Sequence, residues 1–490
     1  MSRTARAARR LDYDLIVIGG GAAGLGAVRA GVRAGARTLL ISDGSPGGAC
    51  TFHGCVPSKT LIESAKQGLT FAAATQRIRE VVTAIAATED ADALRREGVE
   101  VLLGRASFTG PGCIQVAGRV LTARSFVIAT GARPVIPSIP GLTALPHHTN
   151  ETIFDLPTLP TSLVVLGGGA IGCELAQAFA RLGSQVTIIE GRERLLPQED
   201  PAAAEVIAGV FAREGLRVLT SVQVESIRQD GGDIRLQCAD ADDVVAEQLL
   251  VAVGRRPVTG GLGLDRIDAQ IDEDGQLVTD NYLRTTAPGV YAAGDVTGRL
   301  PYTHAAFHMG RIAAGNALAD RPWQRHRYQA RATPWVIFTD PEIARVGMTE
   351  AEAAAHGGQV AYLPLSEMDR ALTAGETDGF ITLVAGPRAL LRSVGGGRVL
   401  GATIVAARAG EMIHGPALAM ATGMFAGRLA ATTHAYPTWS YGVQLAAAQF
   451  FTTIGGRSAR PALPSAPLSQ QASGEDAPQP TGWGPSSGTA

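Results

Sequence analysis

The chain contains two copies of one pattern, in which a short apolar run is followed by glycines, a helical stretch and a second apolar run. In the first copy these are residues 15–18, 25–34 and 38–41. Two buried strands joined by a helix form a parallel β-α-β unit, and glycines at its first turn let backbone N–H groups bind a pyrophosphate. The glycines of this copy are Gly19, Gly21 and Gly24.

The second copy starts at Leu163, 148 positions after Leu15. Its helix is predicted to run to about Leu182 and its second strand over 185–189. This spacing is too long for a solenoid repeat, so the pattern predicts a second dinucleotide-binding domain. The glycines of this copy are Gly167, Gly169 and Gly172.

The residue after the second strand of such a unit binds a ribose, and an acid is expected there. In the first copy Ser42 stands at this position and Asp43 follows, so either could hold an adenosine ribose. In the second copy it is Glu190, which can accept both ribose hydroxyls and would repel a 2′-phosphate. Glu190 therefore favours NADH over NADPH. Arg192 and Arg194 lie nearby, so NADPH is not excluded.

Two cysteines, Cys50 and Cys55, lie five positions apart at the predicted start of a helix. Such positions are about one and a half turns apart, so the sulfurs can form a disulfide if Cys50 lies slightly outside regular helix. The alternatives are a metal-binding pair or two buried thiols, but a zinc site would need a second, closer pair of cysteines. We therefore favour a redox pair. Because Gly54 has no side chain, we expect it to leave space beside the two cysteines. We expect residues 56–58 to break and restart the helix.

The rest of the pattern indicates how the domains are arranged. One long amphipathic helix is predicted over 71–98, and a short strand segment at 289–295 ends in the carboxylate of Asp295 and precedes a helix at 304–318. A strand of this kind after both nucleotide units indicates that the first domain is discontinuous. Strands are predicted at 335–338, 380–384 and 399–405, and Thr349 with Glu352 forms a capping box.

The predicted fold class is therefore α/β, with two Rossmann-like dinucleotide-binding domains and a C-terminal α+β dimerisation domain. The C-terminal region is rich in Pro, Ser, Gly and Gln, as in disordered segments. The predicted parts are a flexible N-terminus (1–11), a discontinuous first domain (12–160 and 286–330), a second domain (161–285), a dimerisation domain (331–455) and a disordered tail (456–490).

Composition excludes several classes of protein. The 490 residues are 46% hydrophobic and 18% charged, with a net charge of −2, which argues against a nucleic-acid or membrane partner. Five cysteines are too few for a disulfide scaffold and favour a reducing compartment. The arginines of residues 1–10 precede no apolar run, and no uncharged apolar stretch is long enough to span a membrane. We expect a soluble, cytoplasmic protein without a signal peptide.

Taken together, these motifs resemble the flavoprotein disulfide reductases, the family of dihydrolipoamide dehydrogenase, glutathione reductase and mercuric reductase. The resemblance covers about residues 12–455. Besides the two glycine loops, it rests on the segments 50–59, 129–131, 254–257, 293–295 and 338–342.

The resemblance implies FAD on the first domain, a nicotinamide on the second and hydride transfer between them. Cys55 would face the flavin as a thiolate, and Cys50 would exchange with the substrate. Lys59 would lie beside the flavin, paired with Glu174, and Asp295 would bind the ribitol. The other implied cofactor contacts, besides both glycine loops and the ribose positions, are Gly48, Thr130, Gly131, Gly254, Arg255, Gly294 and His304.

The sequence departs from two of the named relatives at the proton carrier. In dihydrolipoamide dehydrogenase and glutathione reductase a histidine and a glutamate five positions later serve the neighbouring subunit's cysteines. Here Tyr436 and Tyr441 hold these positions, and a phenol, with a pKa near ~10, is a poor base at neutral pH. His434 or His53 could substitute, or each could be an ordinary structural histidine. Tyrosine at the histidine position resembles mercuric reductase, but no cysteine follows Cys238 to supply that enzyme's C-terminal pair.

The leading hypothesis is a homodimeric FAD-dependent NAD(P)H oxidoreductase whose cysteine pair reduces an acceptor that needs little proton transfer. Metal ions, quinones or a small electrophilic disulfide would qualify. A dihydrolipoamide dehydrogenase-type or low-molecular-weight disulfide reductase with altered acid–base residues is the second hypothesis. A flavin-binding redox sensor with little turnover is the third, and no resident metal is expected.

Overall fold

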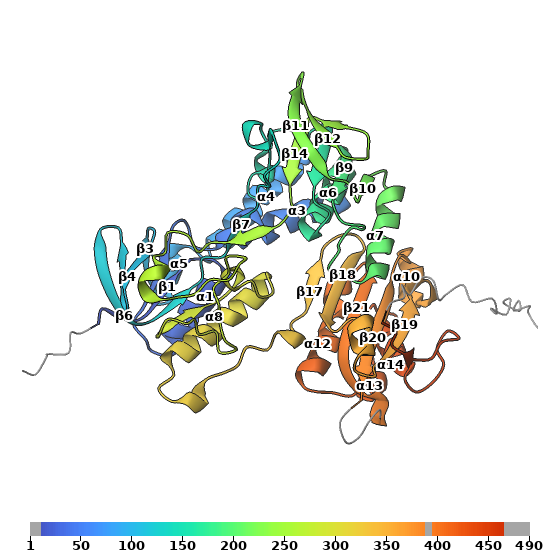
Figure 1. Ribbon diagram of the computed structural model, residues 1–490. Coiled ribbons are helices and arrows are strands. Elements are labelled where there is room, and N and C mark those ends of the chain that lie inside the picture. Colours follow the sequence, from blue (N-terminus) through green and yellow to red (C-terminus); the bar gives the residue numbers. More distant parts are fainter. Residues whose placement is uncertain (1–10, 388–393, 465–490) are drawn as a thin grey trace, which may run out of the picture.

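The computed structural model describes residues 11–387 and 394–464, which form three lobes (Figure 1). The first lobe is built on a seven-stranded sheet, and the second on a four-stranded parallel sheet with a three-stranded antiparallel sheet above it. The third contains a six-stranded antiparallel sheet. This architecture confirms the predicted α/β class. Residues 1–10 of the predicted flexible N-terminus and residues 465–490 of the predicted disordered tail lie outside the described residues.

The first sheet forms around β1, whose apolar residues are fully buried. Leu15 pairs in parallel with Thr38 on one side and with Ser125 on the other. Helices α1 (Ala22–Arg33) and α8 (Thr303–Leu318) cover one face and share a hydrophobic core with it. The strands of this sheet are β1 (Tyr13–Ile18), β2 (Thr38–Ser42), β3 (Glu100–Leu103), β4 (Ser107–Gly110), β5 (Cys113–Val116), β6 (Arg119–Ile128) and β16 (Val290–Ala292).

Strand β16 follows the second glycine loop in sequence and yet pairs in parallel with β6, in the first sheet. The first sheet is therefore completed by a segment from beyond the second lobe, which supports a discontinuous first domain. The boundaries predicted for the domains remain predictions.

The second lobe repeats the strand-helix-strand order of the first. Its helix α6 (Ala170–Leu182) shares a core with α3 (Cys55–Lys66) and α4 (Phe71–Ala86), where Phe71 and Phe179 lie 6.0 Å apart between ring centroids. Its elements are β8 (Ser162–Leu166), β9 (Gln185–Glu190), α7 (Pro201–Arg213), β10 (Arg217–Thr220), β11 (Val224–Asp230), β12 (Asp233–Cys238), β13 (Val244–Ala246) and β14 (Gln248–Val251).

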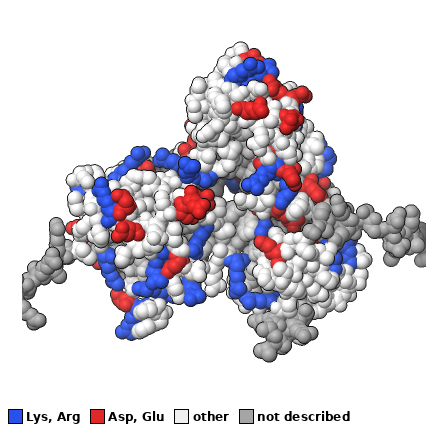
Figure 2. Space-filling view, in the orientation of Figure 1, with Lys and Arg blue, Asp and Glu red and all other residues white. Residues whose placement is uncertain are grey.

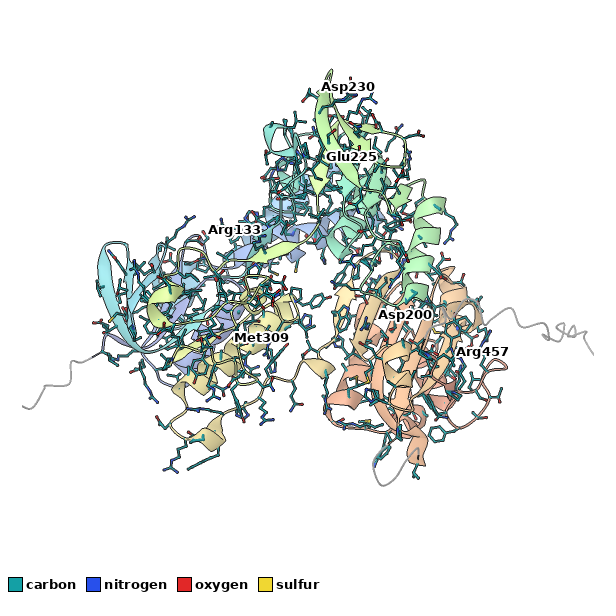
Figure 3. All side chains as sticks on the ribbon, viewed as in Figure 1. Arg133, Asp200, Glu225, Asp230, Met309 and Arg457 are labelled. Carbon is teal, nitrogen blue, oxygen red and sulfur yellow. The ribbon has the colours of Figure 1, made fainter. Side chains whose placement is uncertain are left out.

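A two-stranded ribbon joins these lobes. Strand β7 (Ala132–Pro134) pairs antiparallel with β15 (Arg255–Pro257), so Arg133 lies between the two lobes (Figure 3). The same figure places Asp200, the N-cap of α7, where the second lobe meets the third.

The third lobe packs short helices against its antiparallel sheet. The predicted capping box is confirmed, because Thr349 Oγ1 accepts from Glu352 N and Glu352 Oε2 accepts from Thr349 N. Its elements are β17 (Trp335–Ile337), β18 (Glu342–Gly347), α9 (Glu350–Ala354), β19 (Gln359–Pro364), α10 (Asp369–Ala374), β20 (Phe380–Gly386), β21 (Arg398–Ala406), α11 (Ala409–Met412), α12 (His414–Ala421), α13 (Ala426–Ala431), α14 (Tyr441–Ala448) and β22 (Arg460–Pro461).

Two helix predictions were wrong. The single helix expected over 71–98 is two helices, α4 and α5 (Ala91–Arg96), because Asp90 caps the second through a 2.7 Å hydrogen bond from Ala93 N. The break between the cysteines lies at Gly54, in non-helical backbone, and not at residues 56–58, which belong to α3.

The tail prediction was wrong at its start. Residues 460 and 461 form β22 at the edge of the third sheet, and Arg460 forms an ion pair with the buried Glu350. In the described part of the chain, no helix has the length and apolar character needed to cross a membrane.

Candidate active site

The two glycine loops have the same backbone geometry. Gly19 and Gly167 adopt φ of +113° and +110°, values that L side chains rarely adopt. A Cβ on Gly24 would lie 1.9 Å from Gly19 O, and one on Gly172 would lie 2.0 Å from Gly167 O. Glycine is therefore required for the close helix–strand contact at each loop, as in pyrophosphate-binding turns.

The cysteine segment is packed directly on the first loop. Gly48 begins α2 (Gly48–His53) with φ +64°, and a Cβ there would lie 2.5 Å from the Cα of Gly21. The absence of side chains at both positions brings α2, and Cys50 within it, against the turn predicted to hold the FAD pyrophosphate. The sequence predicted Gly48 as a cofactor contact; the structure gives it this packing role.

Cys50 and Cys55 are both free thiols and lie close enough to hydrogen bond. The hydrogen bond from Cys50, together with the charge of Lys59, lowers the pKa of Cys55 to about 6. The same hydrogen bond, together with burial, raises the pKa of Cys50. Cys55 is the first residue of α3, where a helix terminus favours negative charge. At neutral pH the pair is therefore a Cys55 thiolate that accepts from a Cys50 thiol.

Thr303 is a site residue that the sequence did not reveal. Its Oγ1 lies 3.2 Å from Cys55 Sγ, although the two residues are 248 positions apart. It is the first residue of α8, next to His304, which was predicted to contact a cofactor. His304 Nε2 instead lies 2.6 Å from Pro334 O. Only the position of Thr303 at the start of the helix after Asp295 could have indicated it.

Replacing Thr303 with valine should raise the pKa of Cys55 by roughly one, because one hydrogen bond to the thiolate is lost, a change of about 1.4 kcal/mol. The rate of iodoacetamide alkylation of the reduced protein, measured from pH 5 to 8, reports this midpoint. Thr297→Val, at the last residue of the preceding 3₁₀ turn (Asp295–Thr297), serves as a control because the Thr297 hydroxyl donates to Gly294 O instead. An unchanged midpoint in Thr303→Val would show that this hydroxyl does not act on the thiolate.

Lys59 and Glu174 form the predicted pair, with Nζ 2.7 Å from Oε2. The glutamate side chain is buried, and its other oxygen accepts from Phe338 N at 2.8 Å. The ammonium also lies 4.6 Å from the centroid of the Phe338 ring. All three lobes thus meet at Lys59, one helical turn after Cys55.

The residues predicted to hold FAD fit such a group. Arg255 Nε is buried, has no hydrogen-bond partner in the described chain, and lies 3.8 Å from Asp295 Oδ2. Burial raises the pKa of Asp295. Both side chains can therefore form further hydrogen bonds, and the polar chain of FAD could supply the partners. Apart from their neighbours in sequence, no described residue lies within 4 Å of a Cβ placed on Gly131 or Gly254, so both backbones border open space.

Other predicted FAD contacts have partners in the protein. Thr130 Oγ1 donates to Val258 O at 2.6 Å, and Ser42 is buried behind Gly20. Asp43 is exposed and lies 3.7 Å from arginine nitrogens of Arg105 and Arg133. Asp43 is therefore the more accessible of the two residues proposed for the adenosine ribose. Gly294 adopts φ +80° against the helix pair α1 and α8.

Glu190 lies at the second nucleotide loop. Its Oε2 accepts from Gly168 N at 2.7 Å and its Oε1 from Arg192 N at 2.8 Å. The carboxylate is thus fixed at the carboxyl end of β9, where a ribose is expected. Within the residues that the structure describes, only the chain neighbours of Gly169 lie within 4 Å of a Cβ placed on it, which leaves space for a pyrophosphate beside it.

The predicted proton-carrier residues lie on the third lobe. Tyr436 is 66% exposed, and its hydroxyl donates to Asp369 Oδ2 at 2.8 Å, which raises the pKa of the phenol. Tyr441 packs edge-on against it, with ring centroids 5.7 Å apart. His434 Nδ1 lies 2.9 Å from Thr432 O, and His53 is exposed on α2. The clustering of Asp369 with the tyrosines was not predicted.

Models of the pyridine nucleotide-disulphide oxidoreductase family match residues 13–310, and models of the dimerisation domain of the same family match residues 333–447. The chain belongs to the pyridine nucleotide-disulphide oxidoreductase family. It is therefore a flavoprotein oxidoreductase of a family that uses FAD and a pyridine nucleotide. In the described residues no cluster of three or more His, Cys, Asp or Glu could hold a metal ion.

Several members of this family are similar over most of the chain. Mercuric reductase from Bacillus cereus is 34% identical over 90% of this chain and 72% of its own length. Dihydrolipoyl dehydrogenase from Thermus scotoductus is 35% identical over 89% of this chain and 96% of its own. The Cu(II) complex of the HOCl-induced flavoprotein disulfide reductase RclA from Escherichia coli superposes with a TM-score of 0.80, at 31% identity over 88% of this chain and 98% of that one.

Proposed function

We propose that this protein is an NAD(P)H oxidoreductase that reduces its acceptor through the Cys50–Cys55 pair, and that the acceptor is a metal ion. The arrangement of a Cys55 thiolate with a Cys50 thiol carries this proposal. FAD, when bound, would carry the two electrons from the nicotinamide to this pair. Gly19, Gly21, Gly24, Arg255 and Asp295 are the residues proposed to hold it.

The proton balance favours a metal acceptor. Oxidising Cys50–SH and Cys55–S⁻ to a disulfide releases one proton and two electrons, which reduce two Cu²⁺ ions to Cu⁺ or one Hg²⁺ ion to Hg⁰. Reducing a disulfide to two thiols consumes two protons, so that reaction benefits from an acid–base group worth about 10²–10⁴ in rate. Tyr436 is a poor base because its proton is held by Asp369. The similarity to mercuric reductase and to a flavoprotein disulfide reductase whose solved structure is a Cu(II) complex supports the same class of acceptor.

Initial rates with NADH and Cu(II), Hg(II), a benzoquinone or lipoamide test this proposal. We expect the metal ions to be the fastest acceptors. Tyr436→His should increase the lipoamide rate at least severalfold and leave the metal rate within about twofold, because only the disulfide reaction needs the base. A wild-type protein that turns over lipoamide fastest would instead support a lipoamide-type disulfide reductase.

We propose NADH as the preferred coenzyme. Arg194 donates to the carbonyl oxygens of Leu196, Pro197 and Glu199, so its guanidinium is held by the protein. Glu190 remains at the ribose position and would repel a 2′-phosphate. We expect kcat/KM for NADH to exceed that for NADPH by about tenfold or more, and Glu190→Gln to narrow the difference. Equal values for the two coenzymes in the wild-type protein would contradict this assignment.

We further propose a homodimer in which the third lobe of one subunit completes the active site of the other. The dimerisation-domain match and the exposure of Tyr436 support it. Light scattering of the purified protein should give twice the 50.7 kDa mass of the chain.

A further inference from the structure

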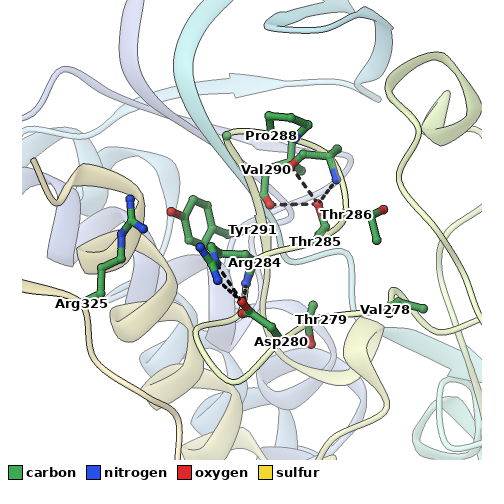
Figure 4. A pocket seen from close by; sticks show the side chains of 12 residues that line it. Val278, Thr279, Asp280, Arg284, Thr285, Thr286, Pro288, Val290, Tyr291 and Arg325 are labelled. Carbon is green, nitrogen blue, oxygen red and sulfur yellow. Dashed lines mark hydrogen bonds and ion pairs between the residues drawn. The ribbon is translucent and has the colours of Figure 1, made fainter. Parts of the chain in front are cut away.

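A cavity of about 550 Å³ lies on the first lobe, outside the site described above (Figure 4). It is formed by the segment that leads into β16 and by Arg325 from the connection between the first and third lobes. Pockets of this size accommodate small organic ligands. Its polar lining includes three threonines, one tyrosine, two arginines and a single acid, Asp280.

The only acid in this lining is already neutralised. Asp280 Oδ2 accepts from Arg284 Nε at 2.7 Å, and its Oδ1 accepts from the backbone of Tyr282 and Arg284. The carboxylate therefore stabilises the turn at residues 280–284, and its charge is neutralised by Arg284 and is not available to a cationic ligand. Figure 4 shows this pair on one side of Tyr291 and Arg325 on the other.

The second arginine of the cavity, Arg325, can form a further hydrogen bond. Arg325 Nε is buried without a hydrogen-bond partner in the described chain, and so is Thr279 Oγ1, which also belongs to the lining. A buried, unpaired guanidinium nitrogen is costly unless a ligand or water satisfies it. Both atoms can donate hydrogen bonds to an anion.

The surroundings of the cavity are strongly basic. The segment 321–331 contains four arginines and a histidine but no acid, in a chain of net charge −2. None of these four arginines forms a salt bridge in the described structure, and two of them line a second cavity of about 420 Å³. Figure 2 shows arginine side chains, with a few acidic ones among them, over this lower part of the first lobe. The four arginines are Arg321, Arg325, Arg327 and Arg331.

We propose that this cavity binds a small polyanion, a molecule that carries two or more linked phosphate groups. Arg325 and Thr279, which lie on opposite sides of Tyr291 in Figure 4, would donate hydrogen bonds to different phosphates of the ligand, and the arginines of 321–331, which form no ion pair in the described structure, provide the field that concentrates the anion. None of the residues that line this cavity belongs to either glycine loop or is among the predicted cofactor contacts. It does not depend on the acceptor proposed above.

Calorimetric titration of the FAD-loaded protein with sodium tripolyphosphate tests this site, in the presence of saturating NAD⁺ so that the second glycine loop is filled. We expect one site per chain that sodium sulfate at matched ionic strength does not reproduce. Arg325→Gln should weaken binding by about tenfold or more, the scale of one charge-assisted contact. Arg321→Gln is the matched control, because this guanidinium lies over the exposed Trp323 ring outside the cavity lining, and should change the affinity less than threefold.

Absence of saturable tripolyphosphate binding to the wild-type protein would overturn the proposal. Equal weakening by both substitutions would also overturn it, since this result would show only diffuse attraction to the basic segment. Thermal melting of both variants identifies any loss of folding. Turnover with metal ions is measured in parallel, and its failure would count against the acceptor assignment but not against this site.

Discussion

Replacing Cys55 with serine should abolish turnover with every acceptor. A serine hydroxyl cannot form a disulfide with Cys50 and does not ionise near neutral pH, so both the electron store and the thiolate are lost. We expect kcat to fall by at least about a thousandfold, the scale on which removal of a reacting group acts. Steady-state rates with NADH and Cu(II) or a quinone measure the loss.

The substitution should not disturb the fold, because serine is slightly smaller than cysteine and Cys55 is only partly buried. Cys113→Ser is a matched control, since Cys113 is also partly buried but lies in β5 of the first sheet. Its rate should equal that of the wild-type protein. A Cys55→Ser protein that retains most of its metal-ion reduction would show that electrons leave by another route.

Replacing Lys59 with methionine should disfavour the thiolate form of Cys55 and lower the stability of the fold. The lysine charge lowers the pKa of Cys55, so its loss moves that pKa upward and slows alkylation of the reduced protein below pH 7. It also leaves Glu174 Oε2 buried without its ion-pair partner. Breaking buried pairs costs about 3–5 kcal/mol, and because the Lys59 side chain is 31% exposed we expect roughly 1–3 kcal/mol here.

Lys66→Met provides the comparison on the same helix. Lys66 pairs with Asp340 at 3.1 Å, but both side chains are partly exposed and Arg181 also binds Asp340. We expect a smaller loss of melting temperature and an unchanged pKa of Cys55. Similar alkylation profiles for Lys59→Met and the wild-type protein would show that Lys59 does not stabilise the Cys55 thiolate.

The sign of the pH dependence follows from the lowered pKa of Cys55. The thiolate dominates above about pH 6 and is protonated below it. The rate at which Cys55 of the reduced protein is alkylated should therefore fall about tenfold for each pH unit below that value. Thr303 and Lys59 act in the same direction, so each substitution moves the fall toward higher pH.

The parts of the fold that follow local rules could be predicted from the sequence. An apolar run, a glycine turn and a helix within about 30 residues specify a β-α-β unit, and both units form as expected. The capping box of Thr349 and Glu352 is likewise local. The break before α5 was also marked by Asp90, but the continuous amphipathic pattern on both sides concealed it.

Contacts between distant segments could not be predicted in this way. Lys59 and Glu174 are 115 positions apart, and only the family resemblance joined them. Thr303 is 248 positions from Cys55, and its place at the start of the helix after Asp295 is the only sequence signal for their contact. The composition after residue 456 predicted disorder, but Arg460 neutralises the buried Glu350 and β22 extends the third sheet, interactions that depend on tertiary structure.

The account depends most on electrons passing through the Cys50–Cys55 pair. Anaerobic addition of one equivalent of NADH to the oxidised holoenzyme, followed by alkylation and mass spectrometry, tests this directly. We predict that both cysteines become alkylated while Cys113, Cys173 and Cys238 do not change. If the flavin absorbance bleaches and neither Cys50 nor Cys55 gains a label, the cysteine pair is not the electron exit and the proposed mechanism is wrong.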